Sequence, residues 1–150
     1  MCMKKMSNEQ VLTFAKDFVG RLYEIGCYQL DEVVIRTADI TISLEYLIGL
    51  TEARNEGNEE EYKKYFKHAD GWYESEEKLE EIIPRVVEDK SIEAVIFCEG
   101  ALWEDLYYCE AYGSNDEKIN KIYQVFLNTV QNHKMWYEWE SGVIFLYGAS

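Results

Sequence analysis

Hydrophobic positions near the start of the chain recur with the period of an amphipathic helix. Apolar side chains lie three and four positions apart, so they share one helix face: Val11, Leu12, Phe14, Ala15, Phe18, Val19, Leu22 and Tyr23. Ser7 and Gln10, in front of this stretch, have the spacing of a capping box. Gly26 follows it, and glycine is common just after the end of a helix. The pattern predicts a helix over residues 8–25.

The next segment carries two periods at once. Every second residue from Ala38 to Leu50 is apolar, and the run Ile40-Thr41-Ile42 has the composition of a strand. The same region also contains a helical stripe, formed by Leu30, Val33, Val34, Thr37, Thr41, Leu44 and Ile48. A strand over this whole region would far exceed the usual length of about 5–6 residues. We therefore predict one long, largely buried helix over residues 31–55, with a strand as the alternative.

Two more helices are predicted before Pro84, the only proline in the chain. Asn58 precedes three glutamates, and the dipole at a helix N-terminus favours acidic residues there. The apolar side chains of this helix are Tyr62, Tyr65 and Phe66. A further helix is predicted to carry Trp72, Tyr73, Leu79, Ile82 and Ile83. It should end at Pro84, because the residue before a proline avoids the helical conformation.

Strand-like segments dominate the rest of the sequence. Runs rich in β-branched and aromatic residues predict strands over residues 92–97, 102–112, 135–140 and 143–147. An amphipathic helix begins near Asp116 and separates the second strand from the third. The predicted fold class is α+β, with a helical N-terminal half packed on a C-terminal antiparallel ββαββ sheet. We expect one domain over residues 1–150, with a helical part (1–90) and a mixed part (91–150).

The charge of the chain is strongly negative. Its 150 residues include 15 basic and 29 acidic side chains, which gives a formal net charge of −14. Residues 31–118 hold 24 of the acids and 9 of the bases, so the excess lies in the middle of the chain. Because phosphate contacts need lysine and arginine, direct binding to nucleic acid or to an anionic membrane is disfavoured.

Acidic and large aromatic residues coincide in this middle region, which predicts a partner-binding surface. Glu74, Glu77 and Glu81 share one face of the predicted helix. The candidate residues are Glu59, Glu60, Trp72, Tyr73, Glu74, Glu76, Glu77, Glu80 and Glu81. Tryptophan and tyrosine are enriched at interface hot spots. The expected partner is a basic protein, such as a nucleic-acid-binding effector, which the carboxylate-rich helix face would inhibit by occupying its phosphate-binding groove.

The composition is consistent with such a role but has a simpler interpretation. A small, acidic, tyrosine-rich chain with almost no proline resembles, in composition, phage anti-defence proteins, anti-CRISPR proteins among them, and bacterial immunity proteins. The alternative is a solvated acidic face without a partner, which is common for charge runs. A cytoplasmic location is expected, because Lys16 and Asp17 interrupt the first apolar segment and no stretch is apolar enough to span a membrane.

The sequence contains no recognised catalytic or metal-binding motif. The four cysteines, Cys2, Cys27, Cys98 and Cys109, lack the spacing of a metal site, and neither His68 nor His133 has a partner one turn away. We therefore predict no catalytic residue, no cofactor, no metal ion and no enzyme activity. Two other functions remain open. One is a small-molecule pocket or enzyme site lined by Trp103, Tyr107 and Trp136, and the other is a homo-oligomer joined through its surplus aromatic residues.

Overall fold

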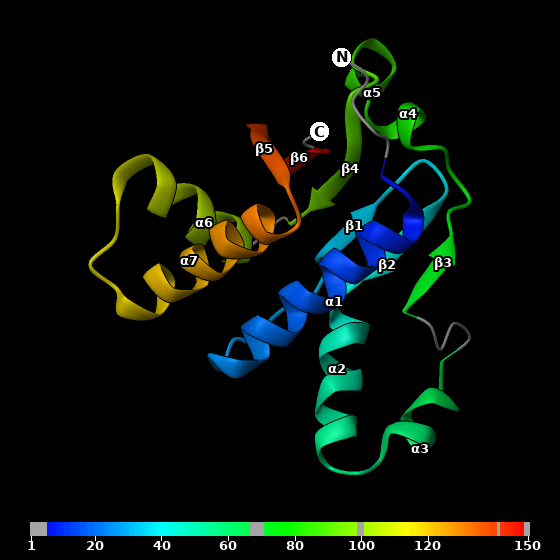
Figure 1. Cartoon of the computed structure of the whole chain (residues 1–150), viewed down its shortest axis with the longest axis vertical. Helices are drawn as coiled ribbons and strands as arrows, with labels where there is room; N and C mark the ends of the chain where they lie inside the picture. Colours follow the sequence, from blue (N-terminus) through cyan, green and yellow to red (C-terminus); the bar gives the residue numbers. More distant parts are fainter. Residues whose placement is uncertain (1–5, 67–70, 99–100, 141, 149–150) are drawn as a thin grey trace.

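Six strands form one antiparallel sheet in the computed structural model, which describes residues 6–66, 71–98, 101–140 and 142–148 (Figure 1). The strands lie in the order β3-β2-β1-β4-β6-β5, and each neighbouring pair is antiparallel. Their bounds are Val34–Arg36 (β1), Ile40–Ser43 (β2), Trp72–Glu74 (β3), Ile92–Phe97 (β4), Met135–Glu140 (β5) and Val143–Gly148 (β6). The predicted α+β class with an antiparallel sheet is confirmed.

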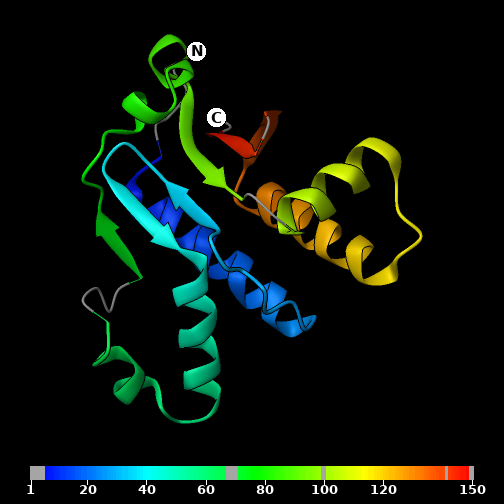
Figure 2. The ribbon, with the colours of Figure 1, turned by 180° about the vertical axis from the view of Figure 1, so that it is seen from behind.

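Seven helices accompany the sheet in the same described residues. They are Asn8–Glu24 (α1), Leu44–Asn55 (α2), Glu59–Lys63 (α3), Leu79–Ile82 (α4), Arg85–Glu88 (α5), Ala101–Tyr112 (α6) and Glu117–Asn132 (α7). In Figures 1 and 2, α6 and α7 lie side by side, and α2 projects beyond the sheet toward α3. None of the helices in the described part of the chain has the length and apolar character needed to cross a bilayer.

One face of the sheet, the helix-covered face, packs against the four longest helices. Alternate strand residues point to this face, as the two-residue period of a strand requires. The core includes the buried rings of Phe14 and Phe18 from α1 and of Phe126 from α7, and α2 and α6 contribute Leu47 and Leu106, among others. The main hydrophobic core therefore joins helices from both halves of the chain.

The opposite face, the outer face, is covered by a much shorter segment. Leu79 is buried there against Val95, Phe145 and Tyr147, and Ile83 and Val86 pack on the same cluster. This cover consists of α4 and α5, which have four residues each. A short, irregular segment thus shields the outer face of the sheet from water.

The N-terminal helix and three strands agree with the sequence predictions. The backbone N–H of Gln10 donates to the Oγ of Ser7 at 3.1 Å, and the side chain of Gln10 accepts from the N–H of Ser7 at 2.8 Å, so the predicted capping box is confirmed. The predicted strands over residues 92–97 and 135–140 coincide with β4 and β5, and the strand over residues 143–147 lies within β6.

The prediction of one helix over residues 31–55 is wrong. Two strands, β1 and β2, precede α2, which begins only at Leu44. The Oγ of Ser43 accepts a hydrogen bond from the N–H of Tyr46 at 3.2 Å, so one residue ends β2 and caps α2. Helix α2 is buried on most sides, which removes the one-sided apolar stripe that identifies a surface helix.

Two other predicted elements are also wrong. Residues 102–112 belong to helix α6 rather than to a strand, because Leu102, Leu106 and Cys109 become buried at helical spacing. The order after residue 91 is therefore βααββ instead of ββαββ. The helix predicted over residues 72–83 is replaced by β3, a turn and α4, because residues 72–74 pair with β2. Three strands thus lie within the part predicted to be helical.

Replacing Leu79 by alanine tests how the outer face is covered. Leu79 is only 2% exposed, so the substitution should lower the free energy of unfolding by about 2–5 kcal/mol. Ile82→Ala on the same helix is the matched control, because Ile82 is 38% exposed and should change stability by only about 0.5 kcal/mol. Urea unfolding measures both. Equal losses in the two variants would show that Leu79 does not anchor the segment.

Candidate functional site

The acidic residues predicted from the sequence lie along one edge of the molecule. Helix α3, strand β3 and helix α4 follow one another along this edge in both Figures 1 and 2. We define the acidic edge as residues 59–66 and 71–82. It holds every predicted site residue: Glu59 and Glu60 on α3, Trp72, Tyr73 and Glu74 on β3, Glu76 and Glu77 in the following turn, and Glu80 and Glu81 on α4.

Five exposed carboxylates occupy the second part of the acidic edge. They belong to Glu74, Glu76, Glu77, Glu80 and Glu81, and the only base within residues 71–82 is Lys78. Among the described residues, none of the five forms an ion pair. They therefore remain hydrated, with their charges available to a ligand.

A buried arginine fixes the backbone beneath these carboxylates. Arg36 on β1 is only 7% exposed, and its Nη2 donates a hydrogen bond to the backbone carbonyl of Glu77. The hydroxyl groups of Thr41 on β2 and Ser75 are also hydrogen-bonded to each other. The turn after β3 is thus held against the sheet through its backbone and Ser75, while the glutamate side chains stay exposed.

Glu59 differs from the other predicted site residues because its charge is already compensated. Its carboxylate accepts from Arg54 at 3.0 Å and from Lys63 at 3.1 Å. Hydrogen bonds from Arg54 and Lys63 lower the pKa of Glu59 from 4.5 to about 2. Glu59 therefore joins α2 to α3, whereas the neighbouring Glu60 is exposed and forms no ion pair within the described residues.

An aromatic cavity lies between α2, α3 and β3. It has a volume of about 340 Å³, and its lining includes Tyr46, Tyr62, Phe66, Trp72 and Tyr73. The ring centroids of Tyr62 and Phe66 are 4.6 Å apart, and those of Tyr46 and Phe66 are 4.7 Å apart. The two aromatic residues predicted as partner anchors, Trp72 and Tyr73, thus line one cavity together with three rings from α2, α3 and the residues that follow α3.

Two glycines make room for this arrangement. A Cβ atom on Gly49, in the interior of α2, would lie 2.0 Å from the hydroxyl oxygen of Tyr62. The ring of Tyr62 can therefore pack against α2 only because residue 49 has no side chain. Gly71 lines the cavity with a φ of +93°, a conformation that L-residues rarely adopt, and a Cβ there would lie 2.7 Å from Leu47.

The surroundings of the cavity are negatively charged. Glu45 is the one charged side chain among the described residues that line it. A second hollow on the far side of Tyr62 is lined by three more carboxylates, from Glu52, Glu56 and Glu61. Burial raises the pKa of Tyr62, and the nearby Tyr46, Glu45 and Glu52 raise it further. The cavity therefore combines aromatic walls with a negative potential.

Sequence reasoning missed three of the five rings and Glu45. Tyr62 and Phe66 have helical spacing, which predicted a helix face but not a cavity. Tyr46 could not be assigned, because its segment was predicted as part of one long helix. Its contact with Tyr62, at a centroid distance of 5.8 Å, depends on the turn between α2 and α3.

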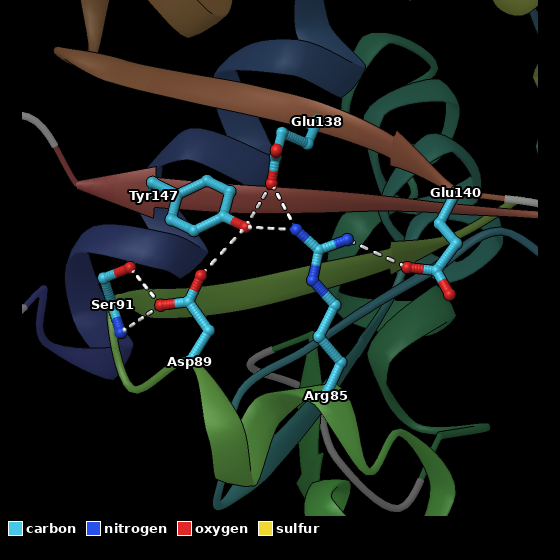
Figure 3. Close-up of polar contacts among 6 residues, drawn as sticks. All are labelled: Arg85, Asp89, Ser91, Glu138, Glu140 and Tyr147. Atoms are coloured by element: carbon cyan, nitrogen blue, oxygen red, sulfur yellow. Dashed lines mark hydrogen bonds and ion pairs between the residues drawn. The ribbon is translucent and has the colours of Figure 1, made fainter.

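A second polar cluster lies on the outer face of the sheet (Figure 3). Arg85 of α5 donates to Glu138 at 2.5 Å and to Glu140 at 2.9 Å, and both carboxylates come from β5. The hydroxyl of Tyr147 also donates to Glu138 at 2.5 Å. The guanidinium lies 4.6 Å from the ring centroid of Phe145. Arg85 thus bridges α5 to the β5–β6 hairpin by ionic and aromatic contacts.

The groups of this cluster satisfy one another, which indicates a structural role. Burial, together with the hydrogen bond to Glu138, raises the pKa of Tyr147, so its hydroxyl stays protonated. The ring of Trp136 stacks on Tyr147 at 4.0 Å. Hydrogen bonds from Ser91 lower the pKa of Asp89 at the base of the cluster. We therefore assign this cluster to fastening α5 on the sheet.

The aromatic residues considered for a C-terminal pocket lie on different faces of the sheet. Tyr107 on α6 contacts Trp139 at a centroid distance of 5.9 Å on the helix-covered face. Trp136 stacks on Tyr147, which belongs to the cluster on the outer face. Tyr107 and Trp136 are therefore separated by the sheet, and the side chain of Trp103 lies outside the described part of the structure.

Within the described residues, no group of three histidine, cysteine or acidic side chains could hold a metal ion. Cys27, Cys98 and Cys109 are free and buried, and burial raises the pKa of Cys98 to about 12. His133 contacts Asp17 at 2.8 Å and joins α7 to α1, while Cys2 and His68 lie outside the described residues. No protein-family model, curated protein or solved structure matches this chain.

Alanine substitutions at two helical glycines test the packing of Tyr62. Gly20→Ala in α1 should raise the free energy of unfolding by about 0.5–1 kcal/mol, because nothing lies within 4 Å of the added Cβ. Gly49→Ala in α2 should give no such gain, because the new methyl group displaces the Tyr62 ring. Urea unfolding and near-ultraviolet circular dichroism measure the two effects. An equal gain in both variants, with an unchanged aromatic spectrum, would contradict the packing described.

The low pKa of Glu59 predicts a pH dependence of stability. Because folding lowers this pKa from 4.5 to about 2, the ionised carboxylate contributes its full stabilisation above pH 4.5 and loses it as the pH falls through 2. Glu59→Gln should therefore be less stable than the wild type at neutral pH, and the difference should shrink toward pH 2. Urea unfolding across this range measures it. Glu60→Gln is the matched control, and a similar profile in that variant would contradict the assignment.

Proposed function

We propose that this protein binds a basic protein partner through the acidic edge and inhibits it. The observation that carries the proposal is the aromatic cavity lined by Trp72 and Tyr73, which lies beside five exposed carboxylates that form no ion pair with any described residue. Apolar rings supply binding energy when they are desolvated, and surrounding charges guide the approach of a partner. Both contributions are present on one surface.

The charge of this edge defines the class of partner. Residues 71–82 carry five glutamates and one lysine, and residues 59–66 add three glutamates and two lysines. A surface with this charge attracts cationic proteins over distances of about 8–10 Å at physiological salt. Proteins that bind nucleic acids present lysine and arginine in grooves that hold phosphates. Occupation of such a groove by the acidic edge would compete with the nucleic acid, which is the inhibitory mechanism that we propose.

Within the described residues, the five glutamates of residues 74–81 form no ion pair. This favours the proposal over a purely structural role for these side chains. Carboxylates that stabilise the fold, such as those of Glu59, Glu138 and Asp17, lie within 3.1 Å of a cationic side chain. The five edge carboxylates gain no such compensation and repel one another, which weakens the compact state. A basic partner would remove that repulsion when it binds.

Charge reversal tests the proposal with a matched pair of variants. Glu74→Lys/Glu77→Lys/Glu81→Lys changes the acidic edge, and Glu24→Lys/Asp31→Lys/Glu104→Lys makes the same change of net charge at exposed positions elsewhere. The wild-type chain is first used to capture proteins from its native host at low salt, and the captured protein is purified. Calorimetry should then show that the edge triple weakens binding at least about tenfold, while the control triple changes it by less than about threefold.

Two further measurements test the class of partner and the inhibitory mechanism: the salt dependence of binding and a competition assay with nucleic acid. Binding of the captured protein should weaken as the salt concentration rises, and the chain should displace a nucleic acid from it. Equal affinities for the two triples would rule out the acidic edge as the binding surface. A captured protein that is not basic, or whose binding is independent of salt, would refute the proposed class of partner.

A further inference from the structure

We infer that the aromatic cavity receives an arginine side chain of the partner. This inference rests on the proposed function, because it names the group that enters the cavity when the basic partner docks on the acidic edge. The cavity volume of about 340 Å³ lies at the small end of the range for ligand pockets, about 300–1,000 Å³. That size suits one side chain better than a large cofactor.

The walls of the cavity have the chemistry that attracts a cation. The faces of tryptophan, tyrosine and phenylalanine rings carry negative potential and bind cations that lie within about 6 Å of the ring centroid. The centroids of Tyr46, Tyr62 and Phe66 are 4.6 to 5.8 Å from one another. The three rings therefore pack on one another and form one aromatic wall, against which a cation in the cavity would lie. A neutral side chain would gain only apolar contact from the same walls.

The charge at the cavity selects a cation over an uncharged apolar group. Glu45 lines the cavity, and its carboxylate can accept two parallel hydrogen bonds from a guanidinium group. Among the described lining residues there is no lysine, arginine or histidine that could neutralise Glu45. Guanidinium is favoured over ammonium, because it is planar, stacks on rings and is more weakly hydrated.

The chain keeps this space at a cost in helix stability. Glycine in a helix interior is about 1 kcal/mol less favourable than alanine, yet Gly49 occupies the middle of α2. Its lack of a side chain lets the Tyr62 ring lie against the helix and form one wall of the cavity. The cost is understandable if the position of Tyr62 serves binding.

Fluorine NMR of the full chain labelled with fluorotryptophan tests the inference. The chain has four tryptophans, and the Trp72 resonance is assigned by its loss in Trp72→Phe. The probes are N-acetyl-arginine amide, N-acetyl-lysine amide and N-acetyl-citrulline amide, the last of which has the shape of arginine but no charge. The arginine probe should shift the Trp72 resonance selectively, with an affinity about tenfold higher than that of the citrulline probe. The lysine probe should fall between them.

Two variants and one matched control locate the binding. Glu45→Gln keeps the shape of the side chain and removes its charge, so it should weaken the arginine probe about threefold or more. Phe66→Leu removes one ring at a position that is 39% exposed, where the fold should tolerate the change. Tyr65→Leu, at a neighbouring residue that does not line the cavity and is 78% exposed, should leave probe binding unchanged.

The outcomes separate this inference from the proposed function. Equal responses to arginine and citrulline, equal shifts of all tryptophan resonances, or insensitivity to both Glu45→Gln and Phe66→Leu would overturn the cavity as an arginine site. The triple Glu74→Lys/Glu77→Lys/Glu81→Lys should weaken partner binding at least about tenfold but leave a Trp72 response to the arginine probe. If the arginine probe binds the cavity but no basic partner is captured, only the proposed function is refuted.

Discussion

The constraint on which this structure depends is the burial of both faces of a six-stranded sheet. The four long helices cover one face, and their apolar side chains form the main core together with those of the strands. The other face also presents large apolar side chains, including Phe145 and Tyr147, and has no long helix to cover it. The segment between β3 and β4 covers this face with two helices of one turn each. Leu79 packs against the outer face, and Arg36 holds the backbone of the segment at Glu77. Arg85 bridges the segment to Glu138 and Glu140 on β5.

The course of that segment also creates the candidate site. Because it must reach the outer face, the chain first passes along the edge of the sheet, where residues 72–74 pair with β2 as β3. Strand β2 leads directly into α2 through Ser43, and Trp72 pairs with Ile42, so β3 begins beside the start of this helix. The helix carries Tyr46, and the turn into α3 returns Tyr62 and Phe66 toward it. The aromatic cavity is therefore a consequence of how the sheet edge joins the helices.

The parts of the fold that could be predicted are those whose neighbours do not alter the local pattern. Helix α1 has one buried face and a complete capping box, and β4, β5 and β6 have strand composition over their full lengths. The incorrect predictions have other causes, one for each element. Helix α2 is buried on several sides, β3 consists of three residues whose conformation depends on pairing with β2, and α6 is rich in residues that favour strands. Trp72 and Tyr73 could be proposed as site residues from the sequence. The positions of Tyr46 and Glu45 at the cavity depend on tertiary contacts, so these two residues could not be.

The conformation of the acidic edge changes what its carboxylates can do. On the single helix predicted from the sequence, Glu77 and Glu81 would lie one turn apart, and each such pair costs about 0.2–0.5 kcal/mol. The strand, turn and short helix distribute the same residues along an extended path, so they do not form a ladder with helical spacing. The acidic edge therefore does not present a regular row of charges. If the acidic edge binds a basic protein as proposed, charge raises the rate of encounter, and selectivity would come from the feature with a defined shape, the aromatic cavity beside Glu45.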